Sequence, residues 1–291
     1  MKRLFLFCLL VSNFAVAQKN VDLTPSIDYY TQAVENYGSE KYEDAIDAYQ
    51  KIPINDTLYP DAQFELALCQ YQLEDYKKAQ KTLNDLLDYR IKFDFKPKVY
   101  ALLGNLYLAD DQNEKGIEVF NTALEKYPYM ASLYNSRGLA QENLKNYKEA
   151  VLDYMAGIQS NFLYGQNHLR LGLLAANQGK YAQAMMSLST FVFINPDNNL
   201  VPEVIAIMEN MSDGTTETDK KDFEIYEGDD PYEDYNILFE NKVALQKKYK
   251  AKFTYSTAFG KQLHLLLKNN EYDKKSKEFW NAHYMPYLQS I

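Results

Sequence analysis

The chain has 291 residues, and 46% of them are hydrophobic, which is enough for a buried core and excludes a wholly disordered protein. Forty acidic residues against 31 basic ones give a net charge of −9, which disfavours non-specific binding to nucleic acid or to an anionic membrane surface. The length allows one large domain or two small ones.

Residues 1–17 have the pattern of a cleaved signal peptide. Two basic residues precede an apolar run at 4–11, and a small-x-small motif ends at Ala17. The run is too short to span a bilayer, and no later run approaches the ~20 residues that a spanning helix needs. We therefore expect cleavage after Ala17, a mature start at Gln18, export to the periplasm and no membrane insertion. Lipidation at Cys8 is the lesser alternative, because a bulky Phe precedes it.

Only Cys69 would remain after cleavage, so the mature chain could form no intramolecular disulfide. Packing must then stabilise the exported fold. The strong excess of lysine over arginine, together with the Ala-Gln junction at 17–18, resembles periplasmic proteins of Bacteroidota.

A short pattern recurs five times along the chain. Its marker positions are Tyr42, Tyr76, Asn113, Tyr147 and Tyr181. Successive markers are 34, 37, 34 and 34 residues apart, so three extra residues are inserted once, near residues 90–96. A fixed period of this length indicates a repeat architecture rather than a single globular core.

Small and large residues recur with the same spacing. The small ones are Ala33, Ala67, Gly104, Gly138 and Gly172, followed within each repeat by Ala45, Ala79, Gly116, Ala150 and Ala184. The large ones are Tyr49, Leu83, Phe120, Tyr154 and Leu188. This resembles the tetratricopeptide repeat (TPR), a helix-turn-helix unit of 34 residues. The resemblance implies an all-α solenoid of about five units over residues 26–196, although Asn113 replaces the usual aromatic.

The flanking segments differ from the repeats. Residues 18–25 would be an N-terminal leader, and 197–211 a capping helix. Residues 212–234 form an acidic linker, and the stretch 209–234 carries a net charge of −9. Residues 235–291 form a helical extension of net charge +6, with Ile237 on its apolar stripe and with a resemblance to a degenerate repeat hairpin. The two charged segments could pair with each other, serve a partner, or face solvent.

Candidates for catalysis are sparse. The three histidines, His168, His264 and His283, are far apart in sequence and form no metal-binding pair. Cys69 is expected to be a small buried hydrophobe. The acidic stretch from Asp213 has ligand-like spacing for calcium but lacks the central glycine. We therefore predict no catalytic residues, no metal and no cofactor, and hence a protein that is not an enzyme.

The resemblance to TPR proteins implies that the first helices of successive units line a concave groove. The predicted groove is aromatic and apolar near the N-terminus and mixed further along. Its predicted residues are Tyr30, Val34, Tyr37, Phe64, Leu68, Tyr71, Asn105, Asn135, Glu142 and Arg170. Exposed apolar and aromatic surface of this kind is typical of a protein or peptide site, and the four tyrosine and phenylalanine rings are expected to form one patch. The alternative is that the tail or a neighbouring chain fills the groove.

Two hypotheses follow for function. The first is a non-enzymatic periplasmic scaffold or adaptor that binds a protein segment in its groove. The second is a structural subunit of an envelope complex for secretion, outer-membrane assembly or uptake, which docks through its C-terminal tail. In both cases the partner is a protein or peptide rather than nucleic acid.

Overall fold

The computed structural model describes residues 24–90, 92–213, 230, 232–242, 245, 258–269 and 279–288. Within these residues all regular secondary structure is helical. The helices are α1 Thr24–Gly38, α2 Tyr42–Tyr49, α3 Tyr59–Gln72, α4 Tyr76–Leu87, α5 Lys96–Ala109, α6 Asn113–Lys126, α7 Ala131–Asn143, α8 Tyr147–Ser160, α9 Gly165–Asn177, α10 Tyr181–Ile194, α11 Val201–Asp213, α12 Glu233–Glu240, α13 Ala258–Asn269, α14 Phe279–His283 and α15 Met285–Leu288. The predicted signal peptide and most of the acidic linker lie outside the described residues.

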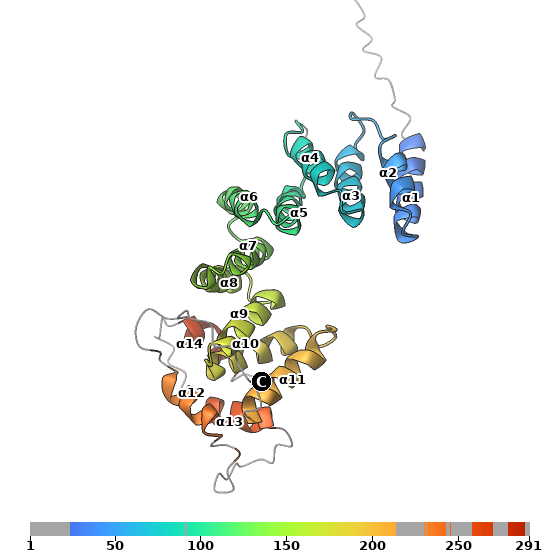
Figure 1. The fold of residues 1–291 in the computed structure, drawn as a ribbon. Helices are drawn as coiled ribbons and strands as arrows, with labels where there is room; N and C mark the ends of the chain where they lie inside the picture. The colour runs from blue at the N-terminus through green and yellow to red at the C-terminus, as the bar shows by residue number, and fades with distance from the viewer. Residues whose placement is uncertain are drawn as a thin grey trace, which may run out of the picture.

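The first ten helices form five antiparallel pairs that stack along one curve (Figure 1). Each helix packs mainly on its partner within the pair and on the adjacent helix of the next pair. In Figure 1, α3, α5 and α7 lie on the inner side of the curve, and α4, α6 and α8 lie on the outer side. The predicted all-α solenoid is therefore confirmed. Its core is divided into several clusters along its length, as expected when each unit contacts only its neighbours.

The small residues are needed where the two helices of a pair cross. A Cβ atom added at Gly104 would lie 2.3 Å from the Phe120 ring, and one at Gly138 would lie 2.6 Å from the Tyr154 ring. One at Gly172 would lie 2.7 Å from Leu188. These distances are far below van der Waals contact, so the large residue of each second helix occupies the space that glycine leaves empty.

The turn inside each pair has one conformation, repeated five times. One residue of each turn has a positive φ of 54–75°; these residues are Glu40, Glu74, Asp111, Lys145 and Gly179. The next backbone N–H bonds to a carbonyl five residues earlier, as in Lys41 to Asn36 and Lys180 to Ala175. This is the Schellman end of a helix, which favours glycine at the left-handed position. Only the fifth turn has glycine there, so the other four carry some backbone strain.

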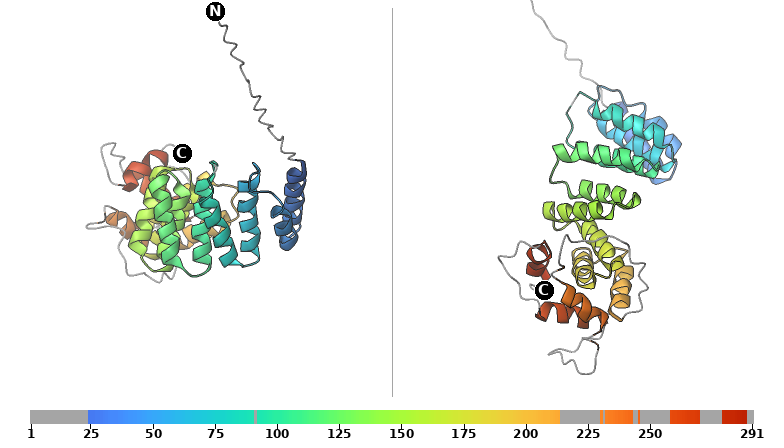
Figure 2. Two further views of the ribbon diagram at one scale, coloured as in Figure 1. Left: turned by 90° about the horizontal axis from the view of Figure 1, so that it is seen from above. Right: turned by 60° about the vertical axis from the view of Figure 1, so that its left-hand side comes forward.

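The C-terminal helices cover the last pair (Figures 1 and 2). Helix α10 contains no charged residue, and its ten residues from Ala182 to Phe191 are all buried. Helices α11, α12 and α13 pack against α10, and α13 makes its main contacts with α11. The expected repeat-like hairpin of the tail stays a prediction, because residues 270–278 within it lie outside the described residues. An uncharged helix that is buried this completely needs neighbours on every side, and the tail supplies the missing cover.

Polar contacts fix this cover in place. The backbone N–H of Ala182 donates to the Asn236 side chain at 2.9 Å. The Lys180 ammonium lies 3.0 Å from Asp230 and 3.3 Å from Glu233, two of the described acids at the end of the acidic segment. The described part of the acidic segment therefore pairs with a lysine of the fifth repeat. Pairing between the acidic segment and the basic tail, which was one of the expected arrangements, stays a prediction, because most of both segments lies outside the described residues.

The apolar stripe predicted in the tail has a different phase in the structure. Ile237 is 45% exposed, whereas Tyr232, Asn236 and Phe239 are buried and face the solenoid. Asn236 is buried because its side chain hydrogen-bonds the start of α10 and also donates to Asp230. A pattern of apolar residues alone could not reveal this polar anchor.

Candidate functional site

The predicted groove residues of the first two pairs divide into two groups. Tyr30, Tyr37 and Phe64 are half-buried, because each ring packs edge-on against a ring from another helix or connection. Their respective neighbours are Tyr49, Tyr42 and Phe95.

The second group is more open to solvent. Val34 is 48% exposed and Tyr71 is 38% exposed, whereas Leu68 is half-buried. Tyr71 also contacts the Tyr76 ring, with 5.9 Å between centroids. Tyr30, Tyr37 and Tyr71 therefore contact rings of their own helix pairs, whereas Phe64 contacts the connection to the third pair. Val34 and Tyr71 are the predicted groove residues with the most exposed apolar surface on these two first helices, where Ile27 of α1 is also exposed.

The remaining groove candidates lie further along the first helices. Asn105 is exposed on α5, and Arg170 is half-buried on α9. The Asn135 amide donates to Asn167 at 3.0 Å, which joins α7 to α9. Glu142 accepts a hydrogen bond from the buried Tyr154 hydroxyl. Asn135 and Glu142 thus have structural partners already, so fewer of their polar atoms are available to a ligand.

The two residues considered for chemistry are both buried. Cys69 has no exposed surface, and burial raises the pKa of its thiol to about 12, so it is a poor nucleophile. His168 is enclosed by Phe162 and Tyr284: its Nε2 lies 2.6 Å from the Phe162 carbonyl and its Nδ1 lies 2.7 Å from the Tyr284 hydroxyl. The carbonyl can only accept, so Nε2 carries the proton and Nδ1 accepts from the tyrosine. His168 therefore joins α9 to the C-terminal cover.

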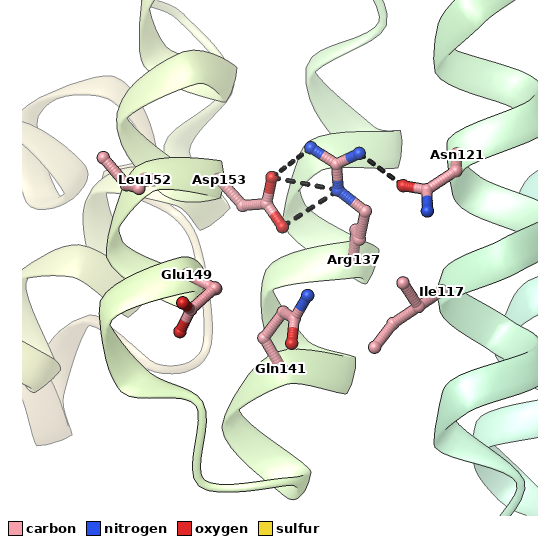
Figure 3. Close-up of a pocket in the computed structure, with 7 residues that line it drawn as sticks. All are labelled: Ile117, Asn121, Arg137, Gln141, Glu149, Leu152 and Asp153. Carbon is pink, nitrogen blue, oxygen red and sulfur yellow. Dashed lines mark hydrogen bonds and ion pairs between the residues drawn. The ribbon is translucent and has the colours of Figure 1, made fainter.

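An ion pair that the sequence analysis did not predict joins α7 to α8, with Asn121 of α6 beside it (Figure 3). Arg137 of α7 holds the Asp153 carboxylate through two nitrogens, at 2.5–3.0 Å, and also donates to Asn121. Burial raises the pKa of the Asp153 carboxyl, and the ion pair with Arg137 opposes that shift. The signal was available in the sequence, because both charged residues stand at repeat positions that face the helix crossing.

This ion pair forms one wall of a pocket of about 230 Å³, which Ile117 and Gln141 also line. A pocket of about 280 Å³ occurs two repeats earlier and is lined by Ile46 and Gln70, the residues at the same repeat positions. The recurrence indicates a niche produced by the stacking geometry. Pockets at this repeat position therefore follow from the packing of the solenoid, and the pocket in Figure 3 is not singled out as a ligand site.

The structure offers little for metal or membrane chemistry. Over the described residues, no group of three or more histidine, cysteine, aspartate or glutamate side chains could hold a metal ion. No described helix is both long enough and apolar enough to cross a membrane. His264 and His283 lie on separate helices of the tail, α13 and α14.

Two curated relatives share part of this chain. Human protein O-mannosyl-transferase TMTC1 is 22% identical over 192 residues, covering 64% of this chain and 21% of that protein. Small glutamine-rich tetratricopeptide repeat-containing protein 2 of Saccharomyces cerevisiae is 30% identical over 95 residues, covering 33% of this chain and 28% of that protein. The chain thus spans less than a third of the length of these relatives.

The fold and the family comparisons agree with the helix pairs. A thermophilic TPR protein of Thermus thermophilus superposes with a TM-score of 0.50 and 17% identity, over 63% of this chain and 98% of that one. The tetratricopeptide repeat family model matches residues 30–91 and 102–162, which span the first four helix pairs. The fold is therefore an α-helical solenoid, and tetratricopeptide repeats are detected in its first four helix pairs.

Proposed function

We propose that this protein is an exported, non-enzymatic scaffold that binds a protein or peptide segment on the inner face of its first two repeats. TPR proteins generally mediate protein–protein interactions, and the fold is typically a non-enzymatic interaction scaffold. The observation that carries the proposal is the open apolar surface of Val34 and Tyr71 on consecutive first helices. Export to the periplasm is proposed from the signal-like residues 1–17 alone.

The geometry supports a division of roles within this face. Tyr30, Tyr37 and Phe64 rest against other rings and so stiffen the surface. Val34 and Tyr71 keep enough exposed area to be covered by a partner. Rigid aromatic side chains make good anchors, because they bury much area while few rotatable bonds become ordered.

The test places a photo-crosslinking amino acid at position 34 and compares it with position 152. Leu152 is the matched control, because it is 57% exposed on the second helix α8, away from the inner face. We expect a discrete crosslinked protein from position 34 and none from position 152. Tyr71→Ser should remove the crosslink and keep the melting temperature within a few degrees, because Tyr71 is partly exposed. Equal crosslinking from both positions, or no effect of Tyr71→Ser, would reject the inner face as the site.

The alternative remains a structural subunit of an envelope complex that docks through its tail. One observation favours it: Ile237 of α12 is an exposed apolar residue on the outside of the cover. Deleting the tail would be a poor test, because Trp280 and Tyr284 belong to the core of the last repeats. Ile237→Lys is better, since it changes the outer surface alone. Loss of the partner in Ile237→Lys, with binding kept in Tyr71→Ser, would favour the tail.

A further inference from the structure

The three-residue insertion that interrupts the repeat spacing brings two connections of the solenoid into contact. The connection from α4 to α5 folds against the earlier connection from α2 to α3. The Tyr89 hydroxyl donates to the Ile54 carbonyl at 2.5 Å, and the Tyr89 ring lies 5.2 Å from the Tyr59 ring. Both connections run from a second helix to the next first helix, so they lie at one edge of the solenoid.

A pocket of about 220 Å³ lies between these two connections. Its lining includes two acidic residues, Asp56 and Asp61, two aromatic residues, Tyr89 and Phe93, and one basic residue, Lys92. Pockets for drug-sized ligands usually measure ~300 Å³ or more, so this one suits a group the size of a side chain.

Asp56 is the unusual member of this lining. It is only 3% exposed, and its Oδ1 accepts a hydrogen bond from the Leu58 backbone at 2.9 Å. Its Oδ2 is buried and has no hydrogen-bond partner. No ion pair joins Asp56 or Asp61 to a basic residue in the part of the chain that the structure describes. A buried carboxylate oxygen without a partner is costly, so a cationic ligand beside this carboxylate would supply a favourable interaction that the chain itself does not.

We propose that this pocket binds the ammonium or guanidinium group of a lysine or arginine side chain from a protein partner. Two carboxylates beside two aromatic rings match such a cation, which gains charge-assisted hydrogen bonds and contact with the ring faces. The Phe93 ring already accepts a cation of the chain itself, because the Lys96 ammonium lies 5.2 Å from its centroid. A hard metal ion fits less well, since the lining has two carboxylates together with rings and a lysine.

Lys92 provides a second test of the proposal. It is exposed, it lines the pocket, and its ammonium carries the same charge as the proposed ligand. Removing that charge should therefore tighten binding of a cation. This site goes beyond the proposed inner-face function and does not depend on it, because neither Val34 nor Tyr71 lines the pocket.

The experiment titrates the 15N-labelled protein with Nα-acetyl-lysine methylamide and follows the backbone amides of Leu58 and Tyr89 by NMR. We expect saturable shifts that Nα-acetyl-norleucine methylamide, which lacks the charge, does not produce. Asp56→Asn should weaken binding about tenfold, the scale of a lost charge-assisted hydrogen bond. Lys92→Ala should strengthen it. Asp94→Asn is the control, because Asp94 is exposed on the same connection and does not line the pocket.

Folding and rival ligands are checked in the same series. The side-chain oxygen of Asn in Asp56→Asn can still accept the hydrogen bond from the Leu58 backbone, so circular dichroism should show an unchanged fold. If Asp56→Asn is unfolded, Asp61→Asn replaces it as the test, because Asp61 is exposed. Equal shifts with the norleucine compound would overturn the proposal. Binding that is unchanged in both asparagine variants would also overturn it, as would displacement of the lysine compound by calcium chloride with the same local shifts.

Discussion

Replacing Gly138 tests the helix crossing on which the whole repeat depends. A Cβ atom there would lie 2.6 Å from Cε1 of Tyr154 and 2.9 Å from its Cζ. The ring cannot easily move away, because Tyr154 is fully buried and its hydroxyl is bonded to Glu142. Either the two helices of the fourth pair must separate or the ring must leave its site.

The magnitude follows from two opposing effects. Overpacking a buried site costs about 1–3 kcal/mol, and Gly→Ala in a helix interior returns about 1 kcal/mol of propensity. Gly138→Ala should therefore lose about 0–2 kcal/mol. Gly138→Leu adds three further carbons to the same space and should lose about 3 kcal/mol, or about 6–12 °C in melting temperature for a protein of this size.

The assay is thermal and urea unfolding followed by far-ultraviolet circular dichroism. Gly38→Ala is the matched control, because nothing lies within 4 Å of a Cβ at the exposed end of α1. Its stability should be unchanged or higher. A melting temperature of Gly138→Leu equal to the wild type would refute the assigned crossing, and equal losses in both glycine variants would show a general effect of glycine replacement.

Three further predictions concern pH, turn strain and export. Burial lowers the pKa of His168 to about 4 from 6.5, so the folded state favours the neutral ring. The free energy of unfolding should therefore be highest above pH 6.5 and fall by about 3 kcal/mol as the pH decreases towards 4. Melting curves of His168→Gln recorded over this range should lose most of the pH dependence. Lys145 has a left-handed φ of 62°, which glycine tolerates better than residues with a side chain. Urea unfolding should therefore give Lys145→Gly a free energy of unfolding about 0.5–1 kcal/mol above that of the wild type, and Lys145→Val one below it. A change in the same direction in both variants would contradict strain at this turn. Mass spectrometry of protein from the native host should find an N-terminus at Gln18 without lipid, and an acylated Cys8 or a retained Met1 would disprove the predicted signal.

The repeat was accessible from the sequence because its requirements are local and recur. The pairing of Gly104 with Phe120, or of Gly138 with Tyr154, depends on two residues sixteen positions apart in one hairpin. Because this pairing of a small with a large residue recurs in five repeats with nearly the same spacing, it can be recognised in the sequence. The burial of Cys69 followed from the same rule, since it lies beside the small residue of its helix.

The inner face was less accessible. Helical spacing placed Tyr37 and Phe64 on first helices, but their ring contacts with Tyr42 and Phe95 depend on how far each neighbouring side chain reaches. The same limit applies to Glu142, whose role as a partner of Tyr154 needs the rotamers of both residues. Exposure, which decides what a partner could touch, is a property of the packed neighbours and not of the residue type.

The sequence alone thus determined the helical pairs, their register and the position of the insertion, because these depend on short-range spacing of small, large and apolar residues. Only the tertiary structure decided what the tail and the insertion do. Tyr284 reaches His168 across 116 positions of sequence, and Tyr89 closes over the connection that holds Asp56. Such contacts join segments whose sequences do not follow the repeat, so the repeat pattern cannot predict them. They form only when the stacked helix pairs bring those segments together.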